Sequence, residues 1–317
     1  MDIDEFLQPR LHILLGKGGV GKTTVAAALG TAASNRGLDT LICETEGKSS
    51  LGAMFARGAL GYDEVLLRPH LWARTIKPDE ALVQYLEDHS MLKLSKYLVR
   101  AGLLEYVSTT IPGIKDVLIL GKVKQLVYRN RKYERPYDVI VLDPPAAGHA
   151  VTFLSSPLGI KNAVRMGPLF EQATEVLNLL GDHELTVVHV VTLPEETPVN
   201  EAIEAAEKVV ERTGCRLGVV FVNGCYPTPG EVLRPDELLE AAKEIGVELE
   251  VEVAEGMAAA TAFLADRYRM QQAEKARVAE KLGLPTVELP FLFTTEVSQA
   301  EIEVLASAIV SGLKAAV

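Results

Sequence analysis

Cysteine is scarce in this chain of 317 residues, which has only three and no C-x-x-C motif. A cysteine-based zinc or iron–sulfur site therefore has little support. Cys43 and Cys215 lie in apolar, strand-like runs and are expected to be buried thiols, and Cys225 follows a third such run. Unpaired cysteines of this kind fit a reducing compartment, so we expect the protein to be cytoplasmic.

Basic residues are outnumbered, with 32 Lys and Arg against 43 Asp and Glu, which gives a net charge of −11. This balance disfavours a general nucleic-acid-binding role and a standing attraction to anionic lipid. The chain also lacks any stretch of about 18 uncharged apolar residues, so we expect no transmembrane helix. Its acidic start, Met1–Glu5, has no apolar segment typical of a signal peptide.

The most informative motif is the stretch 16–24, which reads G-K-G-G-V-G-K-T-T and fits the phosphate-loop spacing G-x-x-x-x-G-K-[ST]. The apolar run Leu11–Leu15 precedes it and predicts a buried strand. The run Thr24–Asn35 follows it and predicts a helix. Strand, glycine-rich loop and helix form the context in which this pattern binds nucleotide phosphates.

The chemistry of this loop follows from its residue types. Its glycines allow the backbone to curl so that several N–H groups point at one anion, beside a helix N-terminus. Lys22 should reach the β- and γ-phosphates of ATP, and the Thr23 hydroxyl should ligate Mg²⁺. The nucleotide-binding residues predicted here are Gly16, Gly18, Gly19, Val20, Gly21, Lys22, Thr23 and Thr24.

Two further motifs place carboxylates after apolar runs. Asp143 ends the run Val139–Leu142, where phosphate-loop proteins hold Mg²⁺, and the nearby Gly148 could donate its N–H to a γ-phosphate. Glu44 and Glu46 follow the run Thr40–Cys43, on a strand that should neighbour the loop. Either of these two glutamates could orient the attacking water, and a solvated acidic turn is the alternative.

Apolar runs alternate with helical patterns along most of the chain. This alternation predicts an α/β fold, a doubly wound and mostly parallel sheet of the phosphate-loop NTPase type. The predicted strands are Leu11–Leu15, Thr40–Cys43, Val139–Leu142, Thr186–Thr192, Leu217–Val222 and Thr286–Leu289. The predicted helices that follow the loop helix are Pro198–Thr213, Ala258–Leu282 and Ser298–Ala316.

Two segments do not fit this rhythm and show helical spacing of apolar residues. They are residues 78–135, with no convincing strand, and residues 159–182, which follow the Asp143 motif. We interpret them as an α-helical subdomain inserted in a single ATPase domain spanning 1–317. The alternative is that these helices only cover the sheet.

Several motifs in order resemble the family of arsenite-pump (ArsA) ATPases and tail-anchored-protein targeting ATPases, whose phosphate loop carries an extra lysine. They are the loop 16–24, Asp143–His149, Val191–Glu195, Phe221–Asn223 and Glu288–Phe291. The resemblance is closest to single-domain bacterial members. It implies a homodimer, or a heterodimer with a related chain, that closes over ATP and couples nucleotide state to a client-binding helical region.

The resemblance also implies roles for particular residues. Lys17, which points out of its own cradle, would reach the phosphates of the opposite subunit, and Glu46 would polarise the attacking water. Asn223 matches the adenine-contacting asparagine, and Pro290 and Phe291 match a loop beside the base.

The departures from the family pattern limit what can be inferred. The second switch lacks two hydroxyls, and no zinc-binding cysteine pair, arsenite-binding cysteine cluster or second ATPase half is found. Neither arsenite transport nor tail-anchor targeting is therefore implied. Two alternatives remain open: a weakly catalytic or non-catalytic nucleotide-binding subunit of a paired complex, and a spatial-organisation ATPase of the MinD and ParA kind.

Overall fold

The computed structural model describes residues 1–45, 50–88, 113–129, 136–145 and 147–315. Within these residues one eight-stranded sheet has the order β3-β4-β2-β5-β1-β6-β7-β8. The strand bounds are β1 Leu11–Leu15, β2 Thr40–Glu44, β3 Val65–Arg68, β4 Leu71–Thr75, β5 Val139–Asp143, β6 Thr186–Thr192, β7 Leu217–Cys225 and β8 Thr286–Pro290. All six strands predicted from the apolar runs are present, and the α/β fold class is confirmed.

The sheet is parallel except at one edge. β1 lies near its middle and pairs with β5 on one side and β6 on the other. β3 and β4 form an antiparallel hairpin that the sequence analysis did not predict. The two strands are only four and five residues long, and they are joined by Pro69 and His70, where His70 takes a positive φ of 60°.

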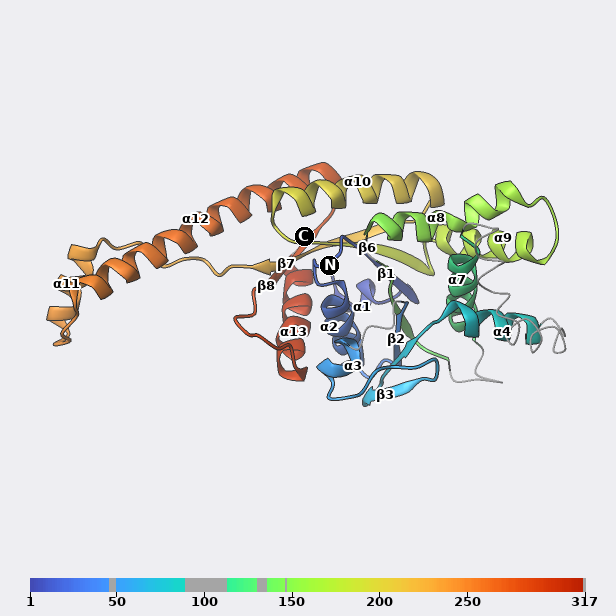
Figure 1. The fold of residues 1–317 in the computed structure, drawn as a ribbon, viewed down its shortest axis with the longest axis horizontal. Coiled ribbons are helices and arrows are strands. Elements are labelled where there is room, and N and C mark those ends of the chain that lie inside the picture. Colours follow the sequence, from blue (N-terminus) through green and yellow to red (C-terminus); the bar gives the residue numbers. More distant parts are fainter. Residues whose placement is uncertain (46–49, 89–112, 130–135, 146, 316–317) are drawn as a thin grey trace.

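One face of the sheet is covered by α1 (Ile3–Phe6), α2 (Lys22–Ser34), α3 (Ser50–Met54) and α13 (Gln299–Ala315) (Figure 1). α2 follows the loop and is buried along nearly its whole length. Gly30 permits its close approach to the sheet, because a Cβ there would lie 2.9 Å from Ile42 Cδ1. The phosphate loop is thus held between a buried strand and a buried helix.

The other face is covered by α7 (Ile114–Val127), α8 (Ala147–Ala163), α9 (Pro168–Gly181) and α10 (Glu196–Thr213), with α4 (Pro78–Asp88) against α7. The predicted helical stretch 159–182 is divided in two, because Gly167 has a φ of 98° and Pro168 starts a new helix. Residues 89–112 and 130–135 lie outside the described residues. The grouping of these helices into one inserted subdomain stays a prediction.

A helical arm extends from the sheet (Figure 1). It consists of α11 (Pro235–Glu244), which was not predicted, and α12 (Val251–Leu282), which begins seven residues before the predicted Ala258. At 1.5 Å per residue, the 32 residues of α12 span about 48 Å. Gln271 attaches its base to the sheet, accepting from the Tyr226 N–H at 2.8 Å and donating to the Gly224 carbonyl at 3.0 Å.

The three cysteines are free and buried, as expected for Cys43 and Cys215. Burial raises the pKa of the Cys43 thiol to about 12 and that of the Cys225 thiol to about 12, so both stay protonated and unreactive. Across the described helices, none combines the length and the apolar character that a membrane crossing needs. Among the same residues, His, Cys, Asp and Glu side chains form no cluster of three that could hold a metal ion.

Candidate functional site at the phosphate loop

The phosphate loop follows β1 at the carboxyl edge of the sheet, where ligands bind in doubly wound folds. Two of its glycines are required by the packing. A Cβ on Gly16 would lie 2.3 Å from the Val191 carbonyl oxygen, and a Cβ on Gly21 would lie 2.3 Å from Asn223 Nδ2. Gly21 also has a φ of 88° at the N-terminus of α2, a conformation that other residues rarely adopt.

Lys22 starts α2 and is buried. Its Nζ donates to the carbonyl oxygens of Gly16 at 3.0 Å and Lys17 at 3.2 Å, so the ammonium group lies within the loop. Neutral carbonyls are weaker partners for an ammonium group than phosphate oxygens are. The position of Lys22 therefore suits an incoming polyphosphate.

The next residue, Thr23, donates from Oγ1 to Asp143 Oδ2 at 2.6 Å. This contact joins the first turn of α2 to the end of β5, which pairs directly with β1. A hydroxyl oxygen and a carboxylate oxygen at this spacing are the kind of ligands that Mg²⁺ takes in nucleotide sites. The two predicted metal ligands are brought together by the structure.

Glu44 lies opposite Asp143 at the ends of β2 and β5. Its strand was expected to neighbour the loop, but β2 is separated from β1 by β5. Glu44 is buried and its Oε1 accepts from Thr75 Oγ1 at 2.5 Å. Burial raises the pKa of this carboxyl, the hydrogen bond from Thr75 opposes the rise, and the charge of Asp143 adds to it. Glu46 lies outside the described residues.

Gly148 is the second residue of α8, which begins four residues after Asp143 ends β5. The predicted second switch is therefore a short connection from the sheet into a helix. Any displacement of this segment would act directly on the start of α8.

The residues assigned to the base lie together at the ends of β7 and β8. Asn223 Nδ2 donates to the Val20 carbonyl at 3.0 Å, so it touches the phosphate loop itself. The Phe291 N–H, just after Pro290, donates to the Cys225 carbonyl at 2.8 Å. The Phe291 ring stacks on Tyr226, with centroids 5.0 Å apart.

Two aromatic residues at this position were missed. Tyr226 follows the end of β7, and Phe293 has its centroid 4.9 Å from that of Phe291. Phe291 and Phe293 are both exposed, so their rings offer flat surface beside Asn223. The aromatic spacing F-L-F after β8 was the available sequence signal.

Lys17 was expected to point away from its own cradle. Its Nζ donates to Glu201 Oε1 on α10 at 2.8 Å, and the two side chains are 39% and 41% exposed. Glu201 was not predicted, because the two residues lie 184 positions apart and only the fold brings them together. The ion pair is accessible to solvent and can therefore be exchanged for another partner at little cost.

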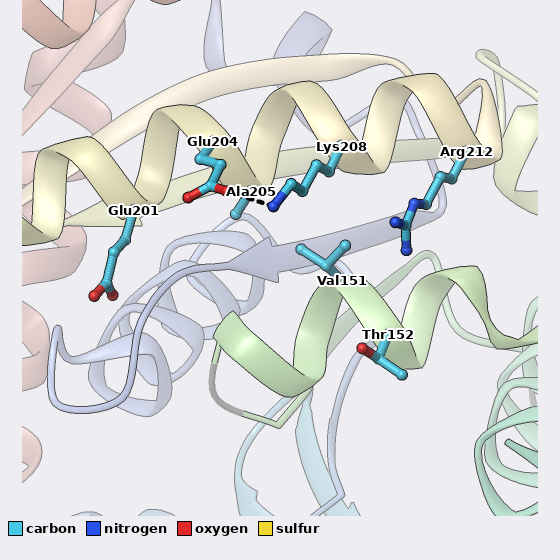
Figure 2. Close-up of a pocket in the computed structure, with 7 residues that line it drawn as sticks. All are labelled: Val151, Thr152, Glu201, Glu204, Ala205, Lys208 and Arg212. Carbon is cyan, nitrogen blue, oxygen red and sulfur yellow. Dashed lines mark hydrogen bonds and ion pairs between the residues drawn. The ribbon is translucent and has the colours of Figure 1, made fainter. Parts of the chain in front are cut away.

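Glu201 also borders a groove between α8 and α10, with a volume of about 460 Å³. Figure 2 shows Arg212 and Val151 extending into the space between the two helices, and Lys208 paired with Glu204 on α10. The groove is lined by Val151, Thr152, Glu201, Glu204, Ala205, Lys208 and Arg212. It therefore lies beside the contact between the helix that follows the second switch and the helix that holds Lys17.

Comparisons with known proteins agree with this geometry. Residues 10–169 match the family described as anion-transporting ATPase. The chain is 32% identical over 301 residues to ATPase BagA of Mycobacterium tuberculosis, covering 89% of this chain and 87% of that protein. It is 30% identical over 208 residues to the arsenical pump-driving ATPase of Escherichia coli, covering 64% of this chain and 33% of that protein.

Proposed function

Because the chain belongs to the anion-transporting ATPase family and is an ATPase, we propose that it works as a nucleotide-dependent switch. In this proposal two subunits close over ATP, and hydrolysis repositions the helices α7, α8 and α9 to hold or release a protein client. The observation that carries the proposal is the short connection between Asp143 and α8, which joins the site to that helix group.

Hydrolysis would proceed by attack of water on the γ-phosphorus of ATP. A new bond forms between the water oxygen and the γ-phosphorus, and the bond from the γ-phosphorus to the oxygen that bridges it to the β-phosphorus breaks. The electron pair of the broken bond stays on ADP, and the water gives up a proton to the released phosphate. Lys22 would stabilise the negative charge that passes to ADP, and Thr23 with Asp143 would hold Mg²⁺, which neutralises the β- and γ-oxygens when it is bound. Glu46 would orient the water and Gly148 would donate its N–H to the γ-phosphate.

The adenine base would lie against Asn223 and the loop 290–291. Asn223 contacts Val20 of the phosphate loop, so the base and phosphate subsites share one hydrogen bond. The rings of Phe291 and Tyr226 would add a stacking surface.

Dimer closure would use Lys17. In the single chain its ammonium group is held by Glu201. In the closed pair it would leave Glu201 and reach the phosphates of the opposite subunit, exchanging one partly exposed carboxylate for a polyphosphate of higher charge. The protein client and the cytoplasmic location belong to the same proposal.

Hydrogen exchange tests the coupling. Amides of α8 and α9, residues 147–181, are compared in saturating ADP and in saturating non-hydrolysable ATP analogue. We expect protection in these helices to differ between the two states, while α13, which covers the other face of the sheet, serves as the internal control and stays unchanged. Equal protection of α8 and α9 in both states would overturn the switch and leave these helices as a cover for the sheet.

The role of Lys17 has a separate test. Lys17→Ala should retain ATP binding by calorimetry but lose hydrolysis and ATP-driven closure, since its target is on the other subunit. Loss of simple binding in this variant would instead assign Lys17 to its own loop.

A further inference from the structure

The groove between α8 and α10 carries its charges on one wall. The α10 wall presents two acidic side chains followed by two basic ones, which are Glu201, Glu204, Lys208 and Arg212 in chain order (Figure 2). Among the described residues that line the groove, α8 contributes Val151 and Thr152, and neither of them is charged. The charges of α10 are therefore not neutralised from across the groove.

The two inner charges of this wall neutralise each other, because Lys208 forms an ion pair with Glu204, one turn earlier on α10. Arg212 differs. Its side chain extends into the groove (Figure 2), and its guanidinium group has no ion-pair partner in the part of the chain that the structure describes. A guanidinium group has five N–H donors and can hold a carboxylate through two parallel hydrogen bonds. The end of the groove at Arg212 therefore offers a place for an anionic group.

Glu201 marks the opposite end of the groove. Its Oε1 accepts from Lys17 Nζ at 2.8 Å, and both side chains are partly exposed, so another ammonium group can replace Lys17 at little cost. Glu201 and Arg212 are eleven residues apart on α10, which corresponds to about 16 Å along the helix at about 1.5 Å per residue. The groove thus has a place for a cation at one end and a place for an anion at the other.

Between these two ends the groove has an apolar part. Val151 of α8 and Ala205 of α10 line it there, and both side chains are buried. The volume of about 460 Å³ falls within the range of about 300–1,000 Å³ that is usual for small-molecule sites. The groove therefore suits a slender ligand whose middle is uncharged.

We propose that the groove binds a short extended peptide with free ends, whose carboxylate lies on Arg212 and whose ammonium group lies on Glu201. An extended chain covers at most about 3.3–3.6 Å per residue, so about five residues span the distance between the two side chains. Glu201 disfavours a ligand with anionic groups at both ends. Arg212 disfavours a ligand with cationic groups at both ends, such as a polyamine.

Binding of the peptide affects Lys17, because the ammonium group of the peptide and that of Lys17 compete for Glu201. Lys17 belongs to the phosphate loop, so an occupied groove releases a loop lysine from its contact with α10. The peptide site does not rest on the proposed switch, since its occupancy is measured without nucleotide. Equal hydrogen exchange in the two nucleotide states would overturn the switch and leave the peptide site standing.

A titration with pentaalanine tests the site and both of its ends. The methyl signals of Val151 and Ala205 are followed by NMR in nucleotide-free protein with EDTA, and they should shift in a saturable way. Acetylation of the amino end or amidation of the carboxyl end should each weaken binding at least about tenfold, because each removes a charged hydrogen-bonding group. The absence of saturable shifts at millimolar peptide would overturn the site. Equal affinity of the acetylated or the amidated peptide would overturn the dipolar ligand.

Three variants assign the two ends. Arg212→Gln should weaken pentaalanine binding at least about tenfold, whereas the control Arg269→Gln, at an exposed arginine on α12, should leave it unchanged. Lys17→Ala removes the competitor for Glu201, so it should strengthen binding of free pentaalanine by up to about fivefold and leave binding of the acetylated peptide unchanged. Unchanged or weaker binding of free pentaalanine in Lys17→Ala would overturn the placement of its ammonium group on Glu201. Unchanged binding in Arg212→Gln would overturn the placement of its carboxylate.

Discussion

The loop helix α2 and the arm helix α12 differ in how much of each helix is buried. α2 has 13 residues and buries eleven of them, so almost every side chain is enclosed by the sheet, α1 or α13. α12 has 32 residues and buries five. The position of α2 is thus set by tertiary packing, whereas α12 is helical mainly because its own sequence, rich in Ala, Glu, Lys and Arg, favours a helix.

The two helices also differ in how they meet the site. α2 supplies Lys22 and Thr23 directly; Lys22 is buried, and Thr23 is held by its hydrogen bond to Asp143. α12 supplies no residue to the phosphate loop, and its Gln271 binds the backbone on both sides of Cys225, beyond Asn223. Changes on α2 should therefore affect nucleotide chemistry and folding strongly, and changes at the exposed positions of α12 should affect neither.

The largest effect is expected for Lys22→Ala at the start of α2. The β- and γ-phosphates lose a buried charged partner, which should weaken ATP binding by about 100-fold or more. Calorimetric titration with ATP and Mg²⁺ gives the affinity. Met257→Ala on the arm is the control and should bind ATP as the parent does. An ATP affinity of Lys22→Ala equal to that of the parent would show that this lysine does not bind the nucleotide.

A pair of truncations measures the difference in packing. Leu29→Ala, in the buried part of α2, should lower the free energy of unfolding by about 3–5 kcal/mol through lost contacts and a cavity. Phe263→Ala on α12 should change it by less than about 0.5 kcal/mol in dilute solution. Urea denaturation measures both. A loss in Phe263→Ala as large as in Leu29→Ala would mean that the arm is part of the core.

Much of this contrast could be predicted from the sequence. The apolar runs predicted the parallel strands, and the loop pattern predicted roles for Lys22, Thr23 and Asp143, which the structure brings together. The strand order was predicted only in part, because β2 was expected beside the loop strand and lies one strand away. The hairpin β3–β4 was missed because its strands are short and only partly buried. Glu201 and Gln271 were missed because each acts through a contact between distant segments.

The arm was only partly predicted for a different reason. Helical periodicity identified the base of α12, where one face packs on the sheet and α10. Towards the tip the apolar residues follow the surface that faces solvent. Reading apolar residues as core therefore hid the start of α12.

Acid should destabilise the sheet through a buried histidine pair that the arm does not have. His12 Nδ1 and His189 Nε2 are 3.0 Å apart, the Val219 N–H donates to His189 Nδ1, and His12 Nε2 contacts the Pro9 carbonyl. His189 therefore carries its hydrogen on Nε2 and donates to His12, and both rings are neutral. Burial lowers the pKa of His12 to about 4 and that of His189 well below its usual range.

The sign of the effect follows from these shifts. Below pH 6.5 the unfolded chain takes up protons that the folded histidine pair does not bind. The free energy of unfolding therefore keeps its full value above pH 6.5 and decreases as the pH falls towards 4. The loss for His12 alone reaches about 3 kcal/mol. Residues 231–282 contain no histidine, so the arm makes no such contribution to the pH dependence of stability. Urea midpoints measured between pH 7 and 4.5 test it; a constant midpoint would contradict the neutral pair.

A small effect on stability is also expected at the ion pair that holds Lys17. Glu201→Gln should change the free energy of unfolding by less than about 1 kcal/mol, because both side chains are partly exposed. The same change should favour ATP-driven closure, since Lys17 is released. Light scattering with the ATP analogue measures closure, and Glu204→Gln on the same helix is the control. Weaker closure in Glu201→Gln would assign Glu201 a supporting role in the pair.

The central place of β1 also dictates an order of events during synthesis. β1 ends at Leu15, yet its two neighbours, β5 and β6, end at Asp143 and Thr192. The phosphate loop thus leaves the ribosome long before the strands that fix it, and these non-local pairings are slow to form. The nascent chain therefore stays unable to bind nucleotide until more than half of it has been made, while α12, whose contacts are mostly local, can form as soon as it emerges.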